Sequence, residues 1–501
     1  MSEPDILVIG SGPAGVSASV PLVEAGRRVL MLDGACADDP EPSGAARILG
    51  LALEGLSNED GLSPKLRAPE ARRALADFRR VHGVEADNFL AVGSIARGGL
   101  SRVWGAFVAE FDAADLEGWP IGPEDMAPSY RRVAERIGIS GTLDDATGAR
   151  LGTVSPLQPS LPLGAASDML LKGYRGDGPL LLGRARNALI SRSREERRAC
   201  DLRGGCLWGC PLGAIYDARH DLARLMRNTN FEVAEKAEVV GLEKQISGWR
   251  VRTADGRGFS AGRVVLAAGT LGSTRLVAPL LPAIPEWRLL SNPVLATPLL
   301  MPRALTASPK PCHDLAQLAF FLSFRDGGDG YVSGAVYETK GLAASSFASQ
   351  LPLGRRAGEA VFRYLSPALL VAVTYFSGAF SDNRLRFEQT GGRLSIRGGF
   401  AADFENLAQR TSRELGRHWR RLGAVPMPGG KLAIPGTDAH FAGTLPMGGT
   451  AANGTNVLGE LKGLPGLHIV DGAVLSTLPS KHATLTIMAN ADRIGTALSR
   501  L

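Results

Sequence analysis

Residues 5–33 read DILVIGSGPAGVSASVPLVEAGRRVLMLD, and this stretch decides the fold class. An apolar run over 5–9 precedes the glycine-rich turn 10–15, a helix-like stretch follows, and a second apolar run ends at Asp33. Short apolar runs of this kind are typical of strands that are buried on both faces of a parallel sheet. Strand, glycine turn, helix, strand and acid in this order predict a βαβ unit that binds a dinucleotide.

Each position of the turn has a physical task in such a unit. Gly10 permits the tight turn, Gly12 lets the backbone approach a pyrophosphate, and Gly15 lets helix and strand pack closely. The partial positive charge of the helix N-terminus faces the phosphates, and Asp33 is placed to accept hydrogen bonds from ribose hydroxyls. The predicted dinucleotide contacts here are Gly10, Gly12, Pro13, Ala14, Gly15 and Asp33. The motif alone does not separate FAD from NAD, and a glycine turn without a ligand is the alternative.

The length and composition of the chain favour a globular protein of two intertwined domains. At 501 residues the chain exceeds a typical single domain, and a hydrophobic fraction of 45% permits a sizeable core. The net charge of +6 is mildly basic. Because the basic residues are scattered, they are typical of solvated faces, and we expect no nucleic-acid binding.

The sequence also bears on the location of the protein. No segment reaches about 18 consecutive apolar residues, the length that indicates a transmembrane helix. The longest apolar-rich run, 365–380, contains Ser, Pro, Thr and Gly and is more typical of a buried strand. No charged leader with an apolar run precedes Asp5, so we expect no signal peptide and a cytoplasmic location. Export together with a partner subunit stays an alternative.

Two further glycine motifs are predicted to contact the same ligand. Residues 97–105 read RGGLSRVWG, and the paired glycines would bring backbone N–H groups close to a flat or anionic group. An ordinary glycine turn is the alternative. Residues 263–272 read RVVLAAGTLG, a second buried strand that ends in a glycine turn. The predicted contacts from these motifs are Arg97, Gly98, Gly99, Ser101, Trp104, Ala268 and Gly269.

The C-terminal part of the chain carries two histidines near turns. His440 is the first residue of the run HFAGTLPMGG over 440–449. His482 precedes a predicted helix that begins at Thr484. Between them, a predicted strand over 467–470 ends on Asp471 and Gly472. Neither histidine lies in an apolar stripe, although position alone does not distinguish an active-site role from chance placement.

Four motifs together make the chain similar to the GMC (glucose–methanol–choline) oxidoreductases, FAD-dependent enzymes that oxidise alcohols. These motifs are Gly10–x–Gly12–x–x–Gly15, Gly98–Gly99 with Trp104, Ala267–Ala268–Gly269–Thr270, and the C-terminal block with His440–x–x–Gly443–Thr444, Asp471–Gly472 and His482–x–Thr484. The resemblance spans nearly the whole chain. It implies that His440 is the general base and that His482 occupies the second active-site position. It also implies FAD contacts at Asp471, Gly472 and Thr484, and at the backbone near Val239.

Alcohol oxidation gives these two histidines a chemical logic. The reaction removes a proton from the hydroxyl and a hydride from its carbon. A neutral imidazole, with a reference pKa of about 6.5, accepts that proton at neutral pH. Flavin N5 accepts the hydride, and a second imidazole holds the hydroxyl oxygen or stabilises the developing alkoxide charge.

The predicted fold class is α/β: a doubly wound, Rossmann-like FAD-binding domain with an α+β antiparallel-sheet substrate domain. Strands are predicted at 318–324, 331–337, 369–376, 384–388 and 394–397, followed by a helix at about 406–422. An antiparallel sheet with one face available for a ligand fits this pattern. The predicted FAD-binding domain comprises 1–110, 185–275 and 435–501, and the substrate domain comprises 111–184 and 276–434.

Three of the five cysteines lie within eleven residues of one another. Cys200, Cys206 and Cys210 have the spacing C-x5-C-x3-C-P. The bacterial ferredoxin run, C-x2-C-x2-C-x3-C-P, has this spacing when its second cysteine is replaced, here by Arg203. Three thiolates would hold a [3Fe–4S] cluster. Packing cysteines without a metal, or zinc with a distant fourth ligand, are the alternatives.

The same spacing resembles the catalytic subunits of bacterial FAD-dependent sugar dehydrogenases, which pass electrons through an iron–sulfur cluster to a cytochrome. We therefore predict a dehydrogenase that oxidises a sugar or polyol hydroxyl and passes electrons to a cytochrome or quinone-linked partner rather than to oxygen. A GMC-type oxidase that uses O2, or an enzyme for an apolar or steroid alcohol, is the first alternative. An NADPH-dependent flavin hydroxylase or reductase, and an electron-transfer flavoprotein without its own substrate, are alternatives from other classes.

Overall fold

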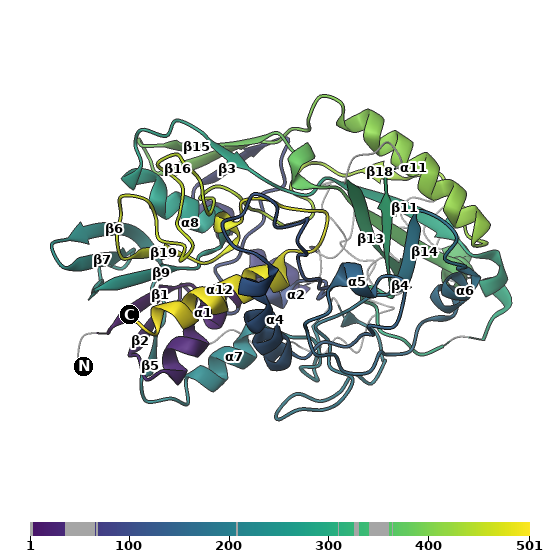
Figure 1. The fold of residues 1–501 in the computed structure, drawn as a ribbon, viewed down its shortest axis with the longest axis horizontal. Coiled ribbons are helices and arrows are strands. Elements are labelled where there is room, and N and C mark those ends of the chain that lie inside the picture. The colour runs from purple at the N-terminus through teal and green to yellow at the C-terminus, as the bar shows by residue number, and fades with distance from the viewer. Residues whose placement is uncertain are drawn as a thin grey trace.

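The computed structural model describes residues 4–35, 66, 69–206, 209–308, 310–324, 330–339, 360–362 and 364–501 of the chain. A parallel sheet forms the part at the left of Figure 1. Its strands, in spatial order, are β19 (Leu467–Ile469), β9 (Arg263–Leu266), β1 (Ile6–Ile9), β2 (Val29–Leu32) and β5 (Phe231–Ala234). All neighbouring pairs are parallel, and β1 and β2 are buried along their whole length.

The two faces of this sheet are covered differently, because successive side chains of a strand point to opposite sides. Ile6 and Val8 belong to the hydrophobic cluster formed with the helices α1 (Pro13–Glu24) and α12 (Thr484–Leu498). Leu7 and Ile9 belong to the cluster that includes Trp249 of a small antiparallel sheet. That sheet consists of β6 (Val239–Gln245), β7 (Gly248–Thr253) and β8 (Gly258–Ala261).

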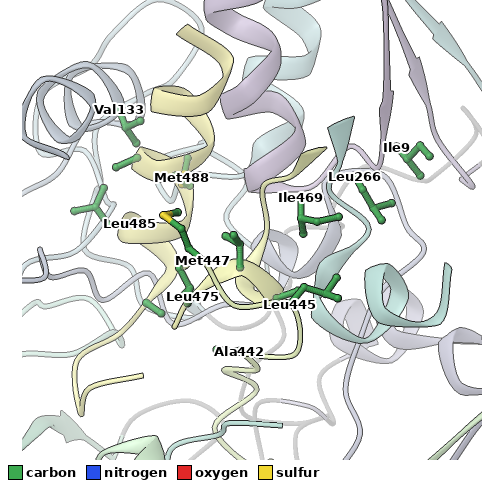
Figure 2. Packing of buried hydrophobic residues seen from close by; sticks show 14 of the residues in the cluster. Ile9, Val133, Leu266, Ala442, Leu445, Met447, Ile469, Leu475, Leu485 and Met488 are labelled. Atoms are coloured by element: carbon green, nitrogen blue, oxygen red, sulfur yellow. The ribbon is translucent and has the colours of Figure 1, made fainter. Parts of the chain in front are cut away.

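Helices pack on one another beside the parallel sheet. The longest contact joins α1 (Pro13–Glu24) to α12 (Thr484–Leu498), and α4 (Pro123–Ile137) packs against the other side of α12 (Figure 1). Helix α7 (Ala218–Leu225) contacts α1. In Figure 2, Leu485 and Met488 of α12 lie beside Met447 and Leu475 of the preceding loops. The C-terminal segment is therefore part of the first core.

A seven-stranded antiparallel sheet forms the part at the right of Figure 1. Its strands are β4 (Leu180–Arg184), β11 (Val294–Leu300), β12 (Leu318–Ser323), β13 (Tyr331–Glu338), β14 (Leu369–Tyr375), β17 (Val425–Pro426) and β18 (Lys431–Leu432). Helices α6 (Ala165–Gly173) and α11 (Phe404–Arg421) cover one face and share its core. The rings of Phe320 on β12 and Trp419 on α11 meet edge-to-face at 5.2 Å.

The remaining elements join the two main sheets. A mixed sheet contains β10 (Trp287–Leu289), β15 (Asn383–Glu388), β16 (Arg393–Arg397) and β3 (Val84–Asp87). The other helices are α2 (Pro69–Leu75), α3 (Phe78–Val81), α5 (Gly148–Leu151) and α8 (Gly269–Val277). Among the described residues, no helix has both the length and the apolar character that a membrane crossing requires.

The pattern of strands in the second half of the chain follows the predicted one closely. The predicted strand at 369–376 is β14, Leu369–Tyr375, and the predicted helix at 406–422 is α11. Helix α4 begins at Pro123 and continues through Pro128. This helix falls inside the predicted substrate domain but packs on α12 of the predicted FAD-binding domain. The domain boundaries themselves stay a prediction.

Candidate active site

A cavity of about 820 Å³ lies between the carboxyl ends of the parallel strands and one face of the seven-stranded sheet. Open α/β sheets bind their ligands at this end of the strands. The predicted cofactor-binding residues that line the cavity are Gly10, Gly12, Pro13, Ala14, Asp33, Gly99, Ser101, Trp104, Val239, Ala268, Gly269, Asp471, Gly472 and Thr484. Both predicted catalytic histidines, His440 and His482, line it as well.

The first glycine turn is shaped by close backbone contacts. Gly10 has a φ of +104°, and a Cβ atom there would lie 2.5 Å from the carbonyl oxygen of Ala267. Gly15 does not line the cavity; its missing side chain leaves room for the Gly10 carbonyl, which a Cβ would approach to 1.9 Å. Helix α1 begins directly after the extended residue Gly12. Its first N–H groups lie at the cavity and are suited to an anion.

The second glycine turn lies against the first. Gly99 has a φ of +58°, and a Cβ atom on it would lie 3.2 Å from the Cα of Gly12. The neighbouring Gly98 stands behind the cavity wall, where its N–H donates to Ser11 Oγ at 3.1 Å. Ser101 Oγ donates to the Gly98 carbonyl at 2.6 Å. Two facing glycine turns leave a cradle that side chains would fill, which fits the backbone-lined site of a dinucleotide.

Asp33 lies at the end of β2 and is buried. Its carboxylate accepts a hydrogen bond from the Ala35 N–H at 3.1 Å and one from Arg97 Nε at 3.3 Å. Burial raises the pKa of Asp33 above its ordinary value, although these donors oppose the shift. Arg97 also pairs with Glu235 at 2.6 Å. Arg97 therefore holds the Asp33 carboxylate from behind, whereas the prediction placed it at the cofactor.

The C-terminal strand and helix α8 meet on the same side of the cavity. Asp471 follows β19, is fully buried, and accepts hydrogen bonds from Ser273 Oγ and from the Ala473 N–H at 3.0 Å. Burial raises the pKa of Asp471 to about 6. Thr270 Oγ1 donates to the Phe441 carbonyl at 2.6 Å. This bond ties the start of α8 to the residue that follows His440.

The rings of the two histidines lie against each other at the cavity. The ring centroids of His440 and His482 are 5.0 Å apart and the rings are nearly perpendicular. The ring of Tyr375 lies 4.5 Å from that of His482 and 6.1 Å from that of His440. Phe107 packs edge-on against His482 at 4.5 Å. The fold thus joins residues from distant parts of the chain into one aromatic cluster.

A buried carboxylate stands beside His440. Asp438 Oδ2 lies 3.8 Å from His440 Nδ1 and accepts a hydrogen bond from the Asn292 N–H at 2.7 Å. A carboxylate beside a ring nitrogen can orient the imidazole. The sequence analysis missed Asp438, Tyr375 and Phe107. Only Asp438 carried a sequence signal, because it lies two residues before His440.

The wall opposite the glycine turns is largely aliphatic. Strands β11, β13 and β14 present alternate residues to the cavity: Val294, Ala296 and Pro298 from β11, Val371, Val373 and Tyr375 from β14, and Tyr337 from β13. The intervening residues, such as Leu295, Leu370 and Ala372, pack under α6 and α11. Tyr337 and Tyr375 are hydrogen-bonded to each other, and burial raises the pKa of Tyr337 to about 12. Glu338 and Lys431 also line the cavity.

The cysteine loop lies beside this cavity without forming a metal site among the described residues. No group of three or more His, Cys, Asp or Glu side chains in this part of the chain is placed to hold a metal ion. Cys206 Sγ accepts a hydrogen bond from the Asp314 N–H at 3.3 Å. Burial raises the pKa of Cys200 and, more strongly, that of Cys206. The predicted iron–sulfur cluster at Cys200, Cys206 and Cys210 gains no support from this geometry.

Comparisons with known proteins bear on the same region. Residues 400–491 match the family model described as GMC oxidoreductase. No curated protein matches the chain. Among solved structures, the chain is similar to pyridoxine 4-oxidase from Mesorbium loti, with a TM-score of 0.60 and 16% sequence identity over 100% of each chain. This likeness shows the fold and confirms the predicted class, a Rossmann-like FAD-binding domain with a β-sheet substrate domain.

The family match covers His440, Asp471 and His482, three residues of the C-terminal segment that line the cavity. GMC oxidoreductases generally bind FAD, and the two glycine turns leave the cradle that such a cofactor needs. Residues 400–491 are therefore similar to the GMC oxidoreductases, and this similarity supports an FAD-dependent oxidoreductase of the class that acts on CH–OH groups.

Proposed function

We propose that the chain oxidises an alcohol to a carbonyl compound in the cavity between the two sheets, with FAD held by the glycine turns. The observation that carries the proposal is the pair of imidazoles, His440 and His482, 5.0 Å apart at the cavity. A substrate hydroxyl bound beside this pair would meet both rings.

The two histidines have different neighbours, and we assign them different roles on that basis. We propose that His440 accepts the hydroxyl proton, because Asp438 at 3.8 Å from Nδ1 stabilises the imidazolium that forms. His482 lies between Phe107 and Tyr375, which fix its ring plane. We assign it to hold the substrate oxygen. Bound FAD would accept the hydride from the carbinol carbon.

We propose the FAD contacts from the positions of the residues that line the cavity. The N-terminus of α1 at Gly12, Pro13 and Ala14 would hold the pyrophosphate, and Asp33 the adenosine ribose. Gly99, Ser101, Trp104, Ala268, Gly269, Asp471, Gly472 and Thr484 would surround the remainder of FAD, with Val239 near the adenine. Gly15, Gly98 and Arg97 would act through these residues by packing and hydrogen bonds.

The wall favours a substrate with an apolar or aromatic body. A sugar would place several hydroxyls against Val371, Val373 and Ala296, where each unpaired polar group costs free energy. We therefore rank the apolar-alcohol alternative above the predicted sugar or polyol. Lys431, at the cavity, would favour the polar substrate, whereas the Glu338 carboxylate accepts a hydrogen bond from the Ser167 N–H of α6.

The electron acceptor is proposed from the cysteine loop. The predicted dehydrogenase with a cytochrome or quinone-linked acceptor would need a [3Fe–4S] cluster at Cys200, Cys206 and Cys210, which the geometry of the described residues does not support. An iron and sulfide analysis of anaerobically purified protein tests this proposal. Flavin with no iron would favour oxygen as the acceptor and leave the three cysteines as packing residues.

Anaerobic flavin reduction tests the central proposal. Benzyl alcohol, pyridoxine, D-glucose and NADPH are each mixed with the FAD-bound protein, and the loss of flavin absorbance is followed. Reduction by an alcohol is expected, and it should be lost in His440→Ala while FAD stays bound. Reduction by NADPH alone, or undiminished reduction in His440→Ala, would instead support a nicotinamide-dependent enzyme or an electron-transfer flavoprotein.

A further inference from the structure

We infer that Lys481 is a positioning residue that holds His482 in place through a buried charge cluster; the inference rests on the proposed function of His482. The side chain of Lys481 is 1% exposed. It belongs to the residue that directly precedes His482, but it extends into a separate site formed by Asp112, Asp115 and Tyr331.

The ammonium group of Lys481 has all its hydrogens engaged. Nζ donates to Asp115 Oδ2 at 2.5 Å, to Asp112 Oδ2 at 2.9 Å and to the Glu110 carbonyl at 3.2 Å. An ammonium group has three N–H donors. Three acceptors therefore fix the position of the ammonium group. The four-carbon side chain is held at its Nζ end as well as at the backbone.

The charges of this cluster balance. Asp112 also lies 3.7 Å from Arg150, and Tyr331 Oη donates to Asp115 Oδ1 at 2.5 Å. Two cations thus face two carboxylates. Burial alone would raise the pKa of Asp112, but the charge and hydrogen bond of Lys481 outweigh it and lower that pKa. Both carboxylates contact Lys481 Nζ, and removing the lysine would take away the cation that they share.

The backbone on the N-terminal side of His482 is held by strand β13 and by the turn that follows β14. The Leu478 carbonyl accepts from the Gly378 N–H at 2.7 Å, and the Ser480 carbonyl accepts from Ser333 Oγ at 2.7 Å. Lys481 adds a third contact, through its side chain, shortly before helix α12 begins at Thr484. The peptide that carries His482 is therefore fixed from two sides.

The carboxylates lie on the segment that also carries an aromatic neighbour of His482. Phe107, Glu110, Asp112 and Asp115 follow one another in a single stretch, and Phe107 packs on the His482 ring at 4.5 Å. The Lys481 cluster thus joins the His482 peptide to the segment that supports its ring. Losing this tie lets the ring move relative to His440, and a displacement of about 1 Å in such a site costs about 100-fold in rate.

The test removes the cluster without leaving an unbalanced charge. Lys481→Met is combined with Asp115→Asn, so that Arg150 and Asp112 remain as one pair. Lys481→Arg keeps the charge and the donors. The matched control is Arg136→Met with Asp221→Asn, another buried ion pair at 2.8 Å, which joins α4 to α7. FAD absorbance and thermal unfolding identify the folded variants.

The main readout does not depend on a substrate. Diethylpyrocarbonate modifies neutral imidazoles, and peptide mass spectrometry gives separate rates for His440 and His482. In Lys481→Met/Asp115→Asn the rate at His482 should rise several-fold while that at His440 stays unchanged, and Lys481→Arg should react like the parent protein. With benzyl alcohol or pyridoxine, kcat should fall about 10- to 100-fold with little change in KM.

Two results would overturn the inference: an unchanged rate at His482 in the folded double variant, or the same rise in the Arg136→Met/Asp221→Asn control. The first would reduce the cluster to a local structural feature, and the second would show general loosening. Failure of the proposed function has a different signature. In that case neither alcohol reduces the flavin of the parent protein, while the change in His482 reactivity persists.

Discussion

At the scale of single residues, Asp471 couples the cavity to pH. Its carboxyl group is fully buried and burial raises its pKa from 3.8 to about 6. A raised carboxyl pKa stabilises the folded state below the unfolded pKa, and this contribution is lost as the pH rises through the folded value. The free energy of unfolding should therefore lose about 3 kcal/mol from this group between about pH 4 and pH 6.

The measurement compares parent protein and Asp471→Asn by chemical denaturation across that pH range. Asparagine does not titrate, so its stability relative to the parent should improve by the same amount as the pH rises. Any lost hydrogen bond from Ser273 adds only an offset that is constant with pH. Two parallel stability curves would show that Asp471 is not a buried acid with a raised pKa.

Gly99 gives a second prediction at this scale. Alanine at a φ of +58° costs about 1–2 kcal/mol wherever it occurs. At Gly99 its Cβ would also approach Gly12 Cα to 3.2 Å, whereas at Gly392, with a φ of +63°, it meets nothing within 4 Å. Gly99→Ala should lower the affinity for FAD at least tenfold, by about 1.4 kcal/mol.

Gly392→Ala is the matched control, because it lies in the turn between β15 and β16, away from the cavity. It should lose similar stability and keep its FAD affinity, measured by fluorescence titration of the apoprotein. Equal FAD affinity in the two variants would remove the second glycine turn from the proposed cofactor site.

At the scale of elements, alternate side chains of strand β14 point to the cavity and to the hydrophobic core. Val371, Val373 and Tyr375 line the cavity, while Leu370 and Ala372 pack under the helices. Val373→Phe should fill part of the cavity and lower kcat/KM for benzyl alcohol, while FAD affinity stays unchanged. Val240→Phe, at an exposed position of β6, is the control for the added ring. Unchanged kcat/KM in Val373→Phe would show that the substrate binds elsewhere.

The elements also show how far the sequence could predict this molecule. Apolar-rich segments located β12 to β16, and the glycine motifs placed the turns that line the cavity. Tyr375 and Phe107 could not be predicted, because their roles depend on long-range packing against His482. Lys481 carried no signal either, since its partners lie more than 360 residues earlier in the chain. The cytoplasmic location and the domain boundaries stay predictions.

At the scale of the whole molecule, the cavity is lined by segments from both sheets and from both halves of the chain. A ligand that binds only the folded chain stabilises it by about 2.7 kcal/mol at a concentration 100 times its Kd. The apoprotein should therefore unfold at a lower temperature than the FAD-bound protein, and added FAD should raise Tm progressively. His440→Ala should keep this shift, and Gly99→Ala should lose most of it. A Tm that is independent of FAD would exclude binding at this cavity.

The order of strands in the parallel sheet has a consequence for how the protein is synthesised. Strand β19, residues Leu467–Ile469, adds to the sheet beside β9, and α12 packs on α1 at the opposite end of the sequence. A chain emerging from the ribosome has β1, β2 and α1 available hundreds of residues before their last partners. The hydrophobic core around the parallel sheet is therefore incomplete during most of translation. Long-range pairing of this kind slows folding and exposes apolar surface, so the nascent chain depends on protection until its final helix has emerged.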